Sequence, residues 1–226
     1  KNSPYSNDVD SYCSDDFLVE INESYEAPGG SSVSDFATGR MPVNTLEEAN
    51  NYIEKVISYE NPANFDKWRQ VATYIADDGW TTEQANGQEG SLHTDQCEDV
   101  SQNHSPDYIK KQKIYIVNYP SEITPQGRRK PEVNKDIVKS WNEGRLVINY
   151  TGHGSTDLWA HEHIFERQVS IPQLTNKDKY PFITIASCDL ARWDDPYNLS
   201  AAEQLVSIKD KGAIAISAAV RPVYSI

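Results

Sequence analysis

Short runs of consecutive apolar residues mark most of the strands that the sequence predicts. The runs cover residues 71–76, 113–119, 145–150, 181–187 and 213–218. They do not alternate between apolar and polar positions, and such continuous runs are typical of strands buried on both faces of a parallel sheet. One more short strand is predicted at residues 36–40, which Pro42 ends.

Segments with helical spacing of apolar residues lie between these runs. Residues 46–59 have this spacing, and Thr45 with Glu48 forms a capping-box pattern in front of them. Asn134 is predicted to cap a helix that Gly144 ends. The other predicted helices are residues 92–102 and 200–208. This order predicts an α/β fold, with a mostly parallel sheet flanked by helices on both faces and the active site at the carboxyl ends of the strands.

The composition narrows the classes of function. Among the 226 residues are 21 Lys and Arg against 34 Asp and Glu, which gives a formal net charge of −13. Binding of nucleic acid or of anionic membranes needs basic faces, so neither partner is expected. No apolar run approaches the roughly 20 residues of a membrane-spanning helix. The chain opens at Lys1 without a signal peptide, and we expect it to be a fragment of a larger protein.

The cysteines and acidic residues give little reason to expect a metal site. Cys13, Cys97 and Cys188 form no CxxC pair, so no structural zinc site is predicted, and buried thiols are one interpretation of all three. Acidic residues near the start of the chain could bind calcium, but their spacing does not match an EF-hand loop. Solvated surface is the preferred interpretation of that segment.

Two reactive side chains follow two of the predicted strands. His153 lies in a Gly-His-Gly turn after residues 145–150, and Cys188 follows residues 181–187. Adjacent strands would bring both to one edge of the sheet, where an imidazole can activate a thiol as nucleophile. Backbone N–H groups of Gly154 and Cys188 could form an oxyanion hole. The alternatives are a turn histidine without a catalytic role and a buried thiol.

Longer motifs around these residues resemble one family. NYTGHGS followed by a tryptophan at residues 149–159, and FATGRMP at residues 36–42 with its following helix, are similar to gingipains, cysteine peptidases of family C25. Within that family, WAHE at residues 159–162 and SCDLARWDDP at residues 187–196 are most similar to PorU-type members, the sortase-like signal peptidases of type IX secretion. Residues 212–225 resemble the same members.

The resemblance implies a caspase-like α/β fold and a catalytic dyad. It assigns the base to His153 and the nucleophile to Cys188, and it divides the chain into a partial N-terminal subdomain, residues 1–110, and a catalytic subdomain, residues 111–226. Gingipains also carry an acidic residue upstream that orients the histidine. Glu98 is the candidate here, with a solvated helix carboxylate as the alternative. The family's calcium sites and Arg or Lys specificity are not carried over, and no cofactor is expected.

The function implied is a cysteine endopeptidase at the cell surface, on the extracellular face of the outer membrane. PorU-type members cleave C-terminal sorting signals from exported cargo proteins and can transfer the acyl group to lipopolysaccharide, so cargo, lipopolysaccharide and other secretion-system components are the partners expected. Two alternatives remain open: a secreted gingipain-like general endopeptidase, and a non-catalytic fragment that retains the fold.

The substrate-binding residues are predicted from their positions beside the dyad. Trp159 and His161 are expected to line the cleft; a metal site at His161 and His163 is the weaker interpretation, because no third ligand is visible. Residues 217–220 are expected to form a cleft edge that pairs with an extended peptide, with Ser217, Ala218 and Ala219 allowing close approach and Tyr224 closing the pocket. His93 and His104 are predicted on the surface. Trp193 is expected either to wall the leaving-group side or to pack within its loop.

Overall fold

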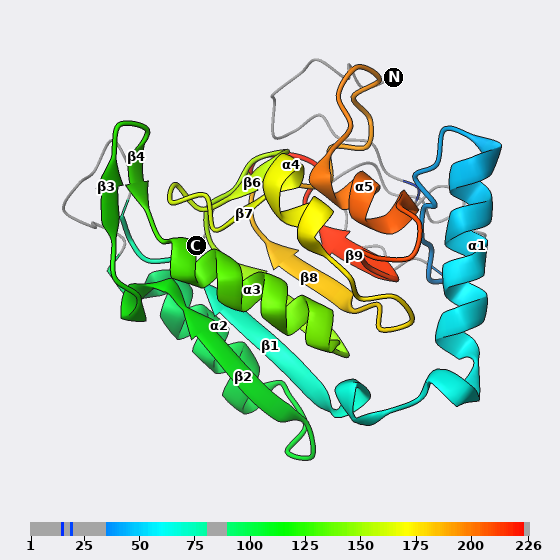
Figure 1. Ribbon diagram of the computed structural model, residues 1–226, viewed down its shortest axis with the longest axis horizontal. Coiled ribbons are helices and arrows are strands. Elements are labelled where there is room, and N and C mark those ends of the chain that lie inside the picture. Colours follow the sequence, from blue (N-terminus) through cyan, green and yellow to red (C-terminus); the bar gives the residue numbers. More distant parts are fainter. Residues whose placement is uncertain (1–14, 16–18, 20–34, 81–89, 224–226) are drawn as a thin grey trace.

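A five-stranded parallel sheet forms the centre of the protein (Figure 1). The computed structural model describes Asp15, Val19, residues 35–80 and residues 90–223. From one edge to the other, the strands are β2 (Lys110–Tyr115), β1 (Val71–Ala76), β5 (Val147–Thr151), β8 (Phe182–Ala186) and β9 (Ala215–Ala218). The predicted parallel α/β architecture is therefore confirmed.

The strands follow the apolar runs closely in the middle of the sheet and less closely at its edge. β1 covers the same residues as the predicted run, and five of its six residues are buried. β2 begins and ends earlier than predicted, because a 3-10 turn at Ile116–Asn118 takes the chain away from the sheet. Ile116 belongs to the apolar run because its side chain is fully buried in the core, although the residue does not extend the strand.

Five α-helices accompany the sheet in the described part of the chain. They are α1 (Leu46–Glu60), α2 (Leu92–Asn103), α3 (Pro131–Glu143), α4 (Arg167–Ser170) and α5 (Ala201–Ser207). The capping box of Thr45 and Glu48 at α1 is confirmed. Gly144 ends α3 as predicted, at φ 88°, but the helix begins at Pro131 and not at Asn134. Proline suits the first turn of a helix because its missing N–H would have no partner there.

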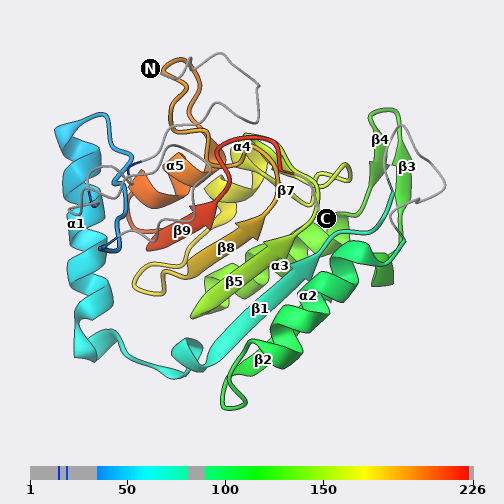
Figure 2. The same ribbon diagram turned by 180° about the vertical axis from the view of Figure 1, so that it is seen from behind.

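The helices α3 and α2 cover opposite faces of the sheet (Figures 1 and 2). On the α3 side, Ile137 and Trp141 pack with Ile75 and Ile148 in the larger core cluster. On the α2 side, Cys97 packs with alanine and tyrosine side chains of β1 in a smaller cluster. Helix α1 lies beyond the β9 edge and packs against α5. No helix in the described ranges is long and apolar enough to cross a membrane.

Some sequence predictions for the connecting segments are wrong. Residues 36–40 form no strand and are exposed. The segment between residues 120 and 131, expected to be a loop, folds into a hairpin of β3 (Glu122–Thr124) and β4 (Gly127–Arg129). A second small hairpin, β6 (Leu158–Trp159) with β7 (Phe165–Glu166), follows the Gly-His-Gly turn. Runs of two or three residues are too short to give a periodic pattern in the sequence.

The predicted boundary between two subdomains at residue 110 falls within the central sheet. β1 comes from the first predicted subdomain, yet it lies between β2 and β5 from the second. Both of its neighbours are hydrogen-bonded to it along most of its length. The two predicted subdomains therefore share one sheet in the described residues.

Candidate active site

The ends of the adjacent strands β5 and β8 place His153 and Cys188 at one edge of the sheet. Thr151 and Ala186 are register partners in the parallel pair, and each reactive residue follows two positions later. The N–H of Gly152 donates to the carbonyl of Ala186 over 3.1 Å, so the pairing continues into the turn. This register brings the two residues to one edge of the sheet, as the sequence predicted.

Asp77 orients His153. It is the first residue after β1, and its N–H donates to the Thr151 carbonyl at the end of β5. Its Oδ2 atom lies 2.9 Å from Nδ1 of His153 and also accepts the His153 backbone N–H over 3.0 Å. The Asp77 side chain is fully buried, whereas that of His153 is 27% exposed. A carboxylate that binds Nδ1–H leaves Nε2 with its lone pair and therefore able to act as a base.

The prediction that Glu98 orients the histidine is wrong. Both Glu98 carboxylate oxygens accept from Lys113, at 2.5 and 2.6 Å, and one accepts from Tyr115. Hydrogen bonds from these groups, Lys113 first, lower the pKa of Glu98 to about 2. The alternative interpretation, a solvated helix carboxylate, fits this exposed side chain. The sequence carries a signal for Asp77, which directly follows an apolar run, but this signal makes it a candidate and does not rank it above Glu98.

The glycines around His153 let the turn approach its neighbours. Gly152 has φ 157°, and a Cβ atom there would lie only 2.3 Å from Cβ of Asp77. A Cβ atom on Gly154 would lie 2.4 Å from Oγ of Ser187. The backbone of the turn thus lies directly against the ends of β1 and β8, which brings His153 between Asp77 and the segment of Cys188.

The backbone N–H of Gly154 forms no hydrogen bond across its antiparallel bridge with Trp159. Gly154 bridges Trp159 in an antiparallel pair. The flanking hydrogen bonds run from Ser155 N–H to the Leu158 carbonyl and from Ala160 N–H to the His153 carbonyl. This places Gly154 at a non-hydrogen-bonded position, where the N–H points away from the partner strand. The geometry agrees with the predicted donor role of Gly154, which stays a prediction together with that of Cys188.

The two described thiols differ in their surroundings. Cys97 is fully buried, and burial raises the pKa of its thiol to about 11. Cys188 is half-buried at the active edge, and its Sγ lies 3.3 Å from the carbonyl oxygen and 3.4 Å from the nitrogen of Val223. Asp189, the next residue, has φ 54°, so the chain turns sharply directly after the thiol. The buried-thiol interpretation therefore applies to Cys97 and not to Cys188.

Two further histidines surround His153. The His161 ring centroid lies 5.1 Å from that of His153, and the predicted contact of His161 with substrate stays a prediction. His93 lies 5.0 Å away with its ring edge-on, and it is buried, so its predicted surface position is wrong. His93, Cys97 and Ser101 are spaced four residues apart and form the buried face of α2. That spacing is the sequence signal for an inward-facing His93.

Trp159 is part of the core and does not line a cleft. Its side chain is fully buried and stacks on Tyr150 at 4.7 Å and on Phe165 at 4.8 Å between ring centroids. The prediction that Trp159 contacts substrate is therefore wrong. Nδ1 of His163 lies 3.1 Å from a carboxylate oxygen of Glu166, and neither set of possible metal ligands in the described residues contains His163 or His161.

A buried ionic cluster lies behind Asp77. Arg128 donates to both oxygens of Asp78, at 2.8 and 3.2 Å, and also pairs with Glu162. Lys130 adds a contact of 3.1 Å to Asp78. Burial, followed by the charges of Asp78 and Asp77, raises the pKa of Glu162 to about 7. The sequence predictions did not include this cluster, because its members come from three separate segments.

Two sets of donor atoms in the described residues could hold a metal ion. One oxygen of Asp77 and one nitrogen each of His93 and His153 lie within 4.8 Å of one another, and so do carboxylate oxygens of Asp77, Asp78 and Glu162. Arg128 and Lys130 already supply positive charge to the second set. The expectations of no cofactor and of no resident metal stay predictions.

The segment after β9 lies beside the nucleophile. The N–H of Ala191 donates to the Ala219 carbonyl over 3.1 Å, and that of Asp189 donates to the Arg221 carbonyl over 3.4 Å. Ser217 is exposed on the edge strand β9, and Ala218 and Ala219 are half-buried. The geometry is compatible with the predicted cleft edge, whose contact with substrate stays a prediction. Tyr224 lies outside the described residues.

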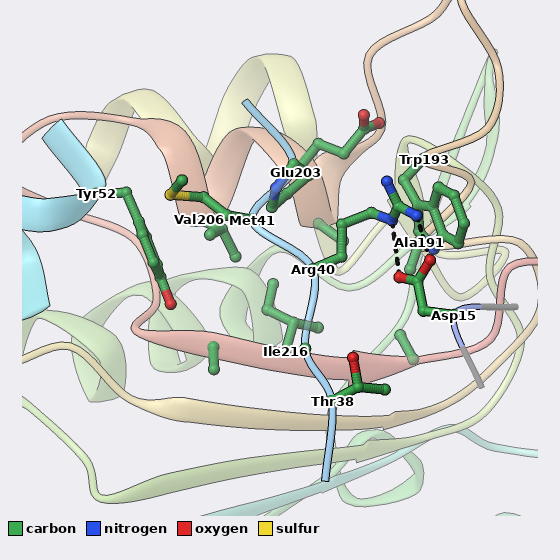
Figure 3. A pocket seen from close by; sticks show the side chains of 15 residues that line it. Asp15, Thr38, Arg40, Met41, Tyr52, Ala191, Trp193, Glu203, Val206 and Ile216 are labelled. Atoms are coloured by element: carbon green, nitrogen blue, oxygen red, sulfur yellow. Dashed lines mark hydrogen bonds and ion pairs between the residues drawn. The ribbon is translucent and has the colours of Figure 1, made fainter. Parts of the chain in front are cut away.

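A cavity of about 480 Å³ opens on the same side (Figure 3). It lies between residues 38–42, helix α5 and strand β9. Arg40 stacks on the ring of Trp193 at 4.1 Å and pairs with Asp15 at its rim. Trp193 therefore contacts a segment outside its own loop and lines this cavity, and its place on the leaving-group side stays a prediction.

Comparisons with known proteins show similarity to peptidase family C25 and to gingipains. The model of peptidase family C25 matches residues 3–226. Gingipain R2 of Porphyromonas gingivalis is 29% identical over 161 residues, which are 71% of this chain and 20% of that protein. Lys-gingipain of the same organism is 29% identical over 194 residues, covering 84% of this chain and 10% of the relative. The chain thus spans a fifth or less of these relatives.

Solved structures show the same fold. The crystal structure of the Arg-specific cysteine proteinase gingipain R has a TM-score of 0.64 at 27% identity, over 86% of this chain and 42% of that one. The complex of the pro- and mature domains of the Porphyromonas gingivalis protein has a TM-score of 0.59 at 26% identity, over 80% of this chain and 40% of that one. The gingipain-type, caspase-like fold class is confirmed.

Proposed function

This chain belongs to peptidase family C25, and from that premise we propose that it is a cysteine endopeptidase with Cys188 as nucleophile and His153 as base. The observation that supports this most is the contact of Asp77 with Nδ1 of His153 at the end of β5, next to the strand that leads to Cys188. A thiol, an imidazole and an orienting carboxylate are the parts that thiol-based acyl transfer needs.

The proposed reaction has two halves. Nε2 of His153 takes the proton of Cys188, and the thiolate attacks the scissile carbonyl while the N–H groups of Gly154 and Cys188 bind the oxyanion. The carbon–nitrogen bond then breaks, and His153 gives its proton to the leaving amine, which leaves a thioester on Cys188. Water, activated by His153, attacks the thioester, and Cys188 regains its proton as the acid leaves.

The substrate is proposed to add as a strand to the edge of the sheet. β9 is an edge strand in the described sheet, and the chain after it pairs with the residues that follow Cys188. Small side chains at residues 217–219 allow a peptide backbone to approach closely. Main-chain pairing of this kind holds an extended peptide while pockets select its side chains.

The substrate class proposed is the C-terminal sorting signal of exported cargo, as for PorU-type members. Two motifs support it, because their residues are built into the site. Glu162 of WAHE joins the ionic cluster behind Asp77, and Asp194 of the SCDLARWDDP segment pairs with Arg221 at 2.5 and 2.9 Å. Attack on the thioester by an amine of lipopolysaccharide, in place of water, would release the cargo as an amide at the cell surface.

A second candidate is a secreted general endopeptidase. The similarity to gingipain R2 and to Lys-gingipain favours it. The third interpretation, a non-catalytic fragment that retains the fold, is disfavoured because Asp77 contacts His153 and because Cys188 follows the neighbouring strand.

Mass spectrometry of a peptide that spans a cargo–sorting-signal junction tests the proposal. The protein is incubated with this peptide, with casein, and with the peptide plus an amine acceptor; the Cys188→Ala variant is the control. We expect one cleavage at the junction and an amide product with the acceptor, both absent from the control. Many cleavages in casein with none at the junction would favour the second candidate, and no turnover of any substrate would refute peptidase activity.

A further inference from the structure

The basic triplet Arg128-Arg129-Lys130 sends two of its side chains toward the back of the catalytic pair. Arg128 belongs to β4 of the small hairpin, and Lys130 precedes α3. The Arg128 guanidinium forms a fork with Asp78, with Nη2 to Oδ2 at 2.8 Å and Nη1 to Oδ1 at 3.2 Å. It also pairs with Glu162 and lies 5.0 Å from the ring centroid of Trp80. Proteolysis as proposed above does not use this fork directly.

The fork is buried directly behind Asp77. Side-chain exposure is 16% for Arg128, 9% for Asp78 and 0% for Glu162. Asp78 is the chain neighbour of Asp77, and its N–H donates to Asp77 Oδ1 over 2.8 Å. Charges in such a site are screened weakly, so each one acts on its neighbours over several ångströms.

The charges in the cluster almost balance. Oxygens of Asp77, Asp78 and Glu162 lie within 4.8 Å of one another; Arg128 pairs with Asp78 and Glu162, and Lys130 pairs with Asp78. Loss of Arg128 would remove the ion pair of Glu162 and leave Lys130 as the basic partner of Asp78. The other ionisable groups near the cluster or His153 are His93 from α2, Tyr150 from β5 and His161 from the β6–β7 turn, and Cys188 follows the neighbouring strand β8.

On the basis of the proposed function, we propose that Arg128 is a positioning residue for His153. Its guanidinium neutralises Asp78 behind Asp77, and it thereby sets the pH range in which His153 can accept the proton of Cys188. Uncompensated negative charge near an imidazole favours the imidazolium, which cannot act as a base. The negative charge of Asp78 therefore favours the imidazolium form of His153 and the positive charge of Arg128 disfavours it, although the two residues form one ion pair.

Titration of His153 by NMR tests this without any substrate. In protein with the Cys188→Ala background, which removes the coupled thiol, the histidine ring signals are followed against pH and His153 is assigned by its loss in His153→Gln. We expect Arg128→Met to raise the His153 midpoint by about 0.5–1 pH unit and Asp78→Asn to lower it by a similar amount. The double variant Arg128→Met/Asp78→Asn should return the midpoint close to the starting value.

Controls separate charge from structure. Arg129→Met removes a positive charge from the same hairpin, but Arg129 donates to the carbonyls of Arg128 and His161 and not to the carboxylates. The His153 midpoint should therefore be unchanged in this variant. Arg128→Lys keeps the charge and should also leave it in place. If Arg128→Met does not fold, Asp78→Asn alone tests the proposal, which requires that the His153 midpoint of this variant is lowered.

Each remaining outcome has a defined meaning. Shifts of the same sign for Arg128→Met and Asp78→Asn, or no shift for either, would overturn the inference and leave the fork as a structural clamp. The measurement does not depend on peptide cleavage. Absence of turnover by the protein would therefore refute the proposed function, whereas an unchanged titration in an active enzyme would refute only the role of Arg128.

Discussion

Asp77 holds His153 by two hydrogen-bonding contacts to the same carboxylate oxygen, one from the backbone N–H and one at Nδ1 of the ring, across 76 positions in sequence. The contact forms because β1 and β5 are neighbours and each residue directly follows, or nearly follows, its strand. The other oxygen of Asp77 accepts the N–H of Asp78. The carboxylate is thus fixed from both sides, and with it the orientation of the imidazole.

Replacement of Asp77 should damage catalysis far more than replacement of Glu98. Asp77→Asn removes the acceptor charge at Nδ1 and should lower kcat/KM by roughly 10²- to 10⁴-fold, the range typical of a disturbed acid–base group. Glu98→Gln should leave kcat/KM within about twofold, because Glu98 pairs with Lys113 and Tyr115. Steady-state kinetics on a junction peptide compares the two variants. Equal losses in both would contradict the assignment of Asp77.

A thiol-directed reagent should distinguish the two described cysteines. Iodoacetamide at neutral pH should label Cys188 and spare Cys97, which is fully buried with a pKa raised to about 11 by that burial. Peptide mapping after brief exposure gives the sites of labelling, and protein unfolded in urea serves as the control in which both react. Labelling of Cys97 without Cys188 in the folded protein would exclude Cys188 as the nucleophile.

Gly152 should not tolerate a side chain. In Gly152→Ala the new Cβ atom would lie 2.3 Å from Cβ of Asp77, in a backbone conformation of φ 157°. The turn must therefore move, and we expect a loss of about 2–4 kcal/mol in the free energy of unfolding together with lost activity. Gly39→Ala is the matched control, since a Cβ atom there meets nothing within 4 Å. Urea unfolding measures both, and equal stability of the two variants would contradict the close approach.

Glu162→Gln should change how stability depends on pH. Burial raises the pKa of Glu162 from 4.5 to about 7 in the folded protein. Between these two values the folded state binds the proton more tightly than the unfolded state, so the free energy of unfolding falls as pH rises through this window. The amide has no proton to lose. The variant should therefore gain about 1–2 kcal/mol relative to the parent between pH 5 and 8.

Thermal or urea unfolding at several pH values measures that difference. Glu166→Gln is a suitable control, because Glu166 lies on β7 nearby and pairs with His163 instead of joining the cluster. A constant difference between Glu162→Gln and the parent across the window would show that Glu162 does not titrate there.

A bulky residue at the edge of the sheet should block substrate more than it harms the fold. Ala219 is half-buried after β9, with its carbonyl bound to the N–H of Ala191. Ala219→Trp should raise KM or lower kcat/KM by roughly tenfold or more and change the free energy of unfolding by less than about 1 kcal/mol. Kinetics and urea unfolding are measured on the same preparation. Unchanged cleavage would place the substrate elsewhere.

The sequence by itself determined the parallel sheet and the two reactive residues. Apolar runs and capping patterns are local, so β1 and α1 could be predicted almost to the residue. His153 and Cys188 could be predicted because each lies within three residues after such a run, and the carboxyl ends of parallel strands share one edge. The helical spacing of His93 and Cys97 also indicates which face of α2 is buried.

Only the tertiary structure decided which acidic group serves His153. Asp77 and Glu98 both precede the histidine at distances that sequence spacing cannot rank, and the strand order alone puts β1 beside β5. Arg128 reaches Asp78 across 50 positions through a hairpin of three-residue strands, which leaves no periodic pattern in the sequence. Local patterns follow from backbone geometry within a few residues, whereas these contacts depend on which distant segments the packing of the sheet brings together.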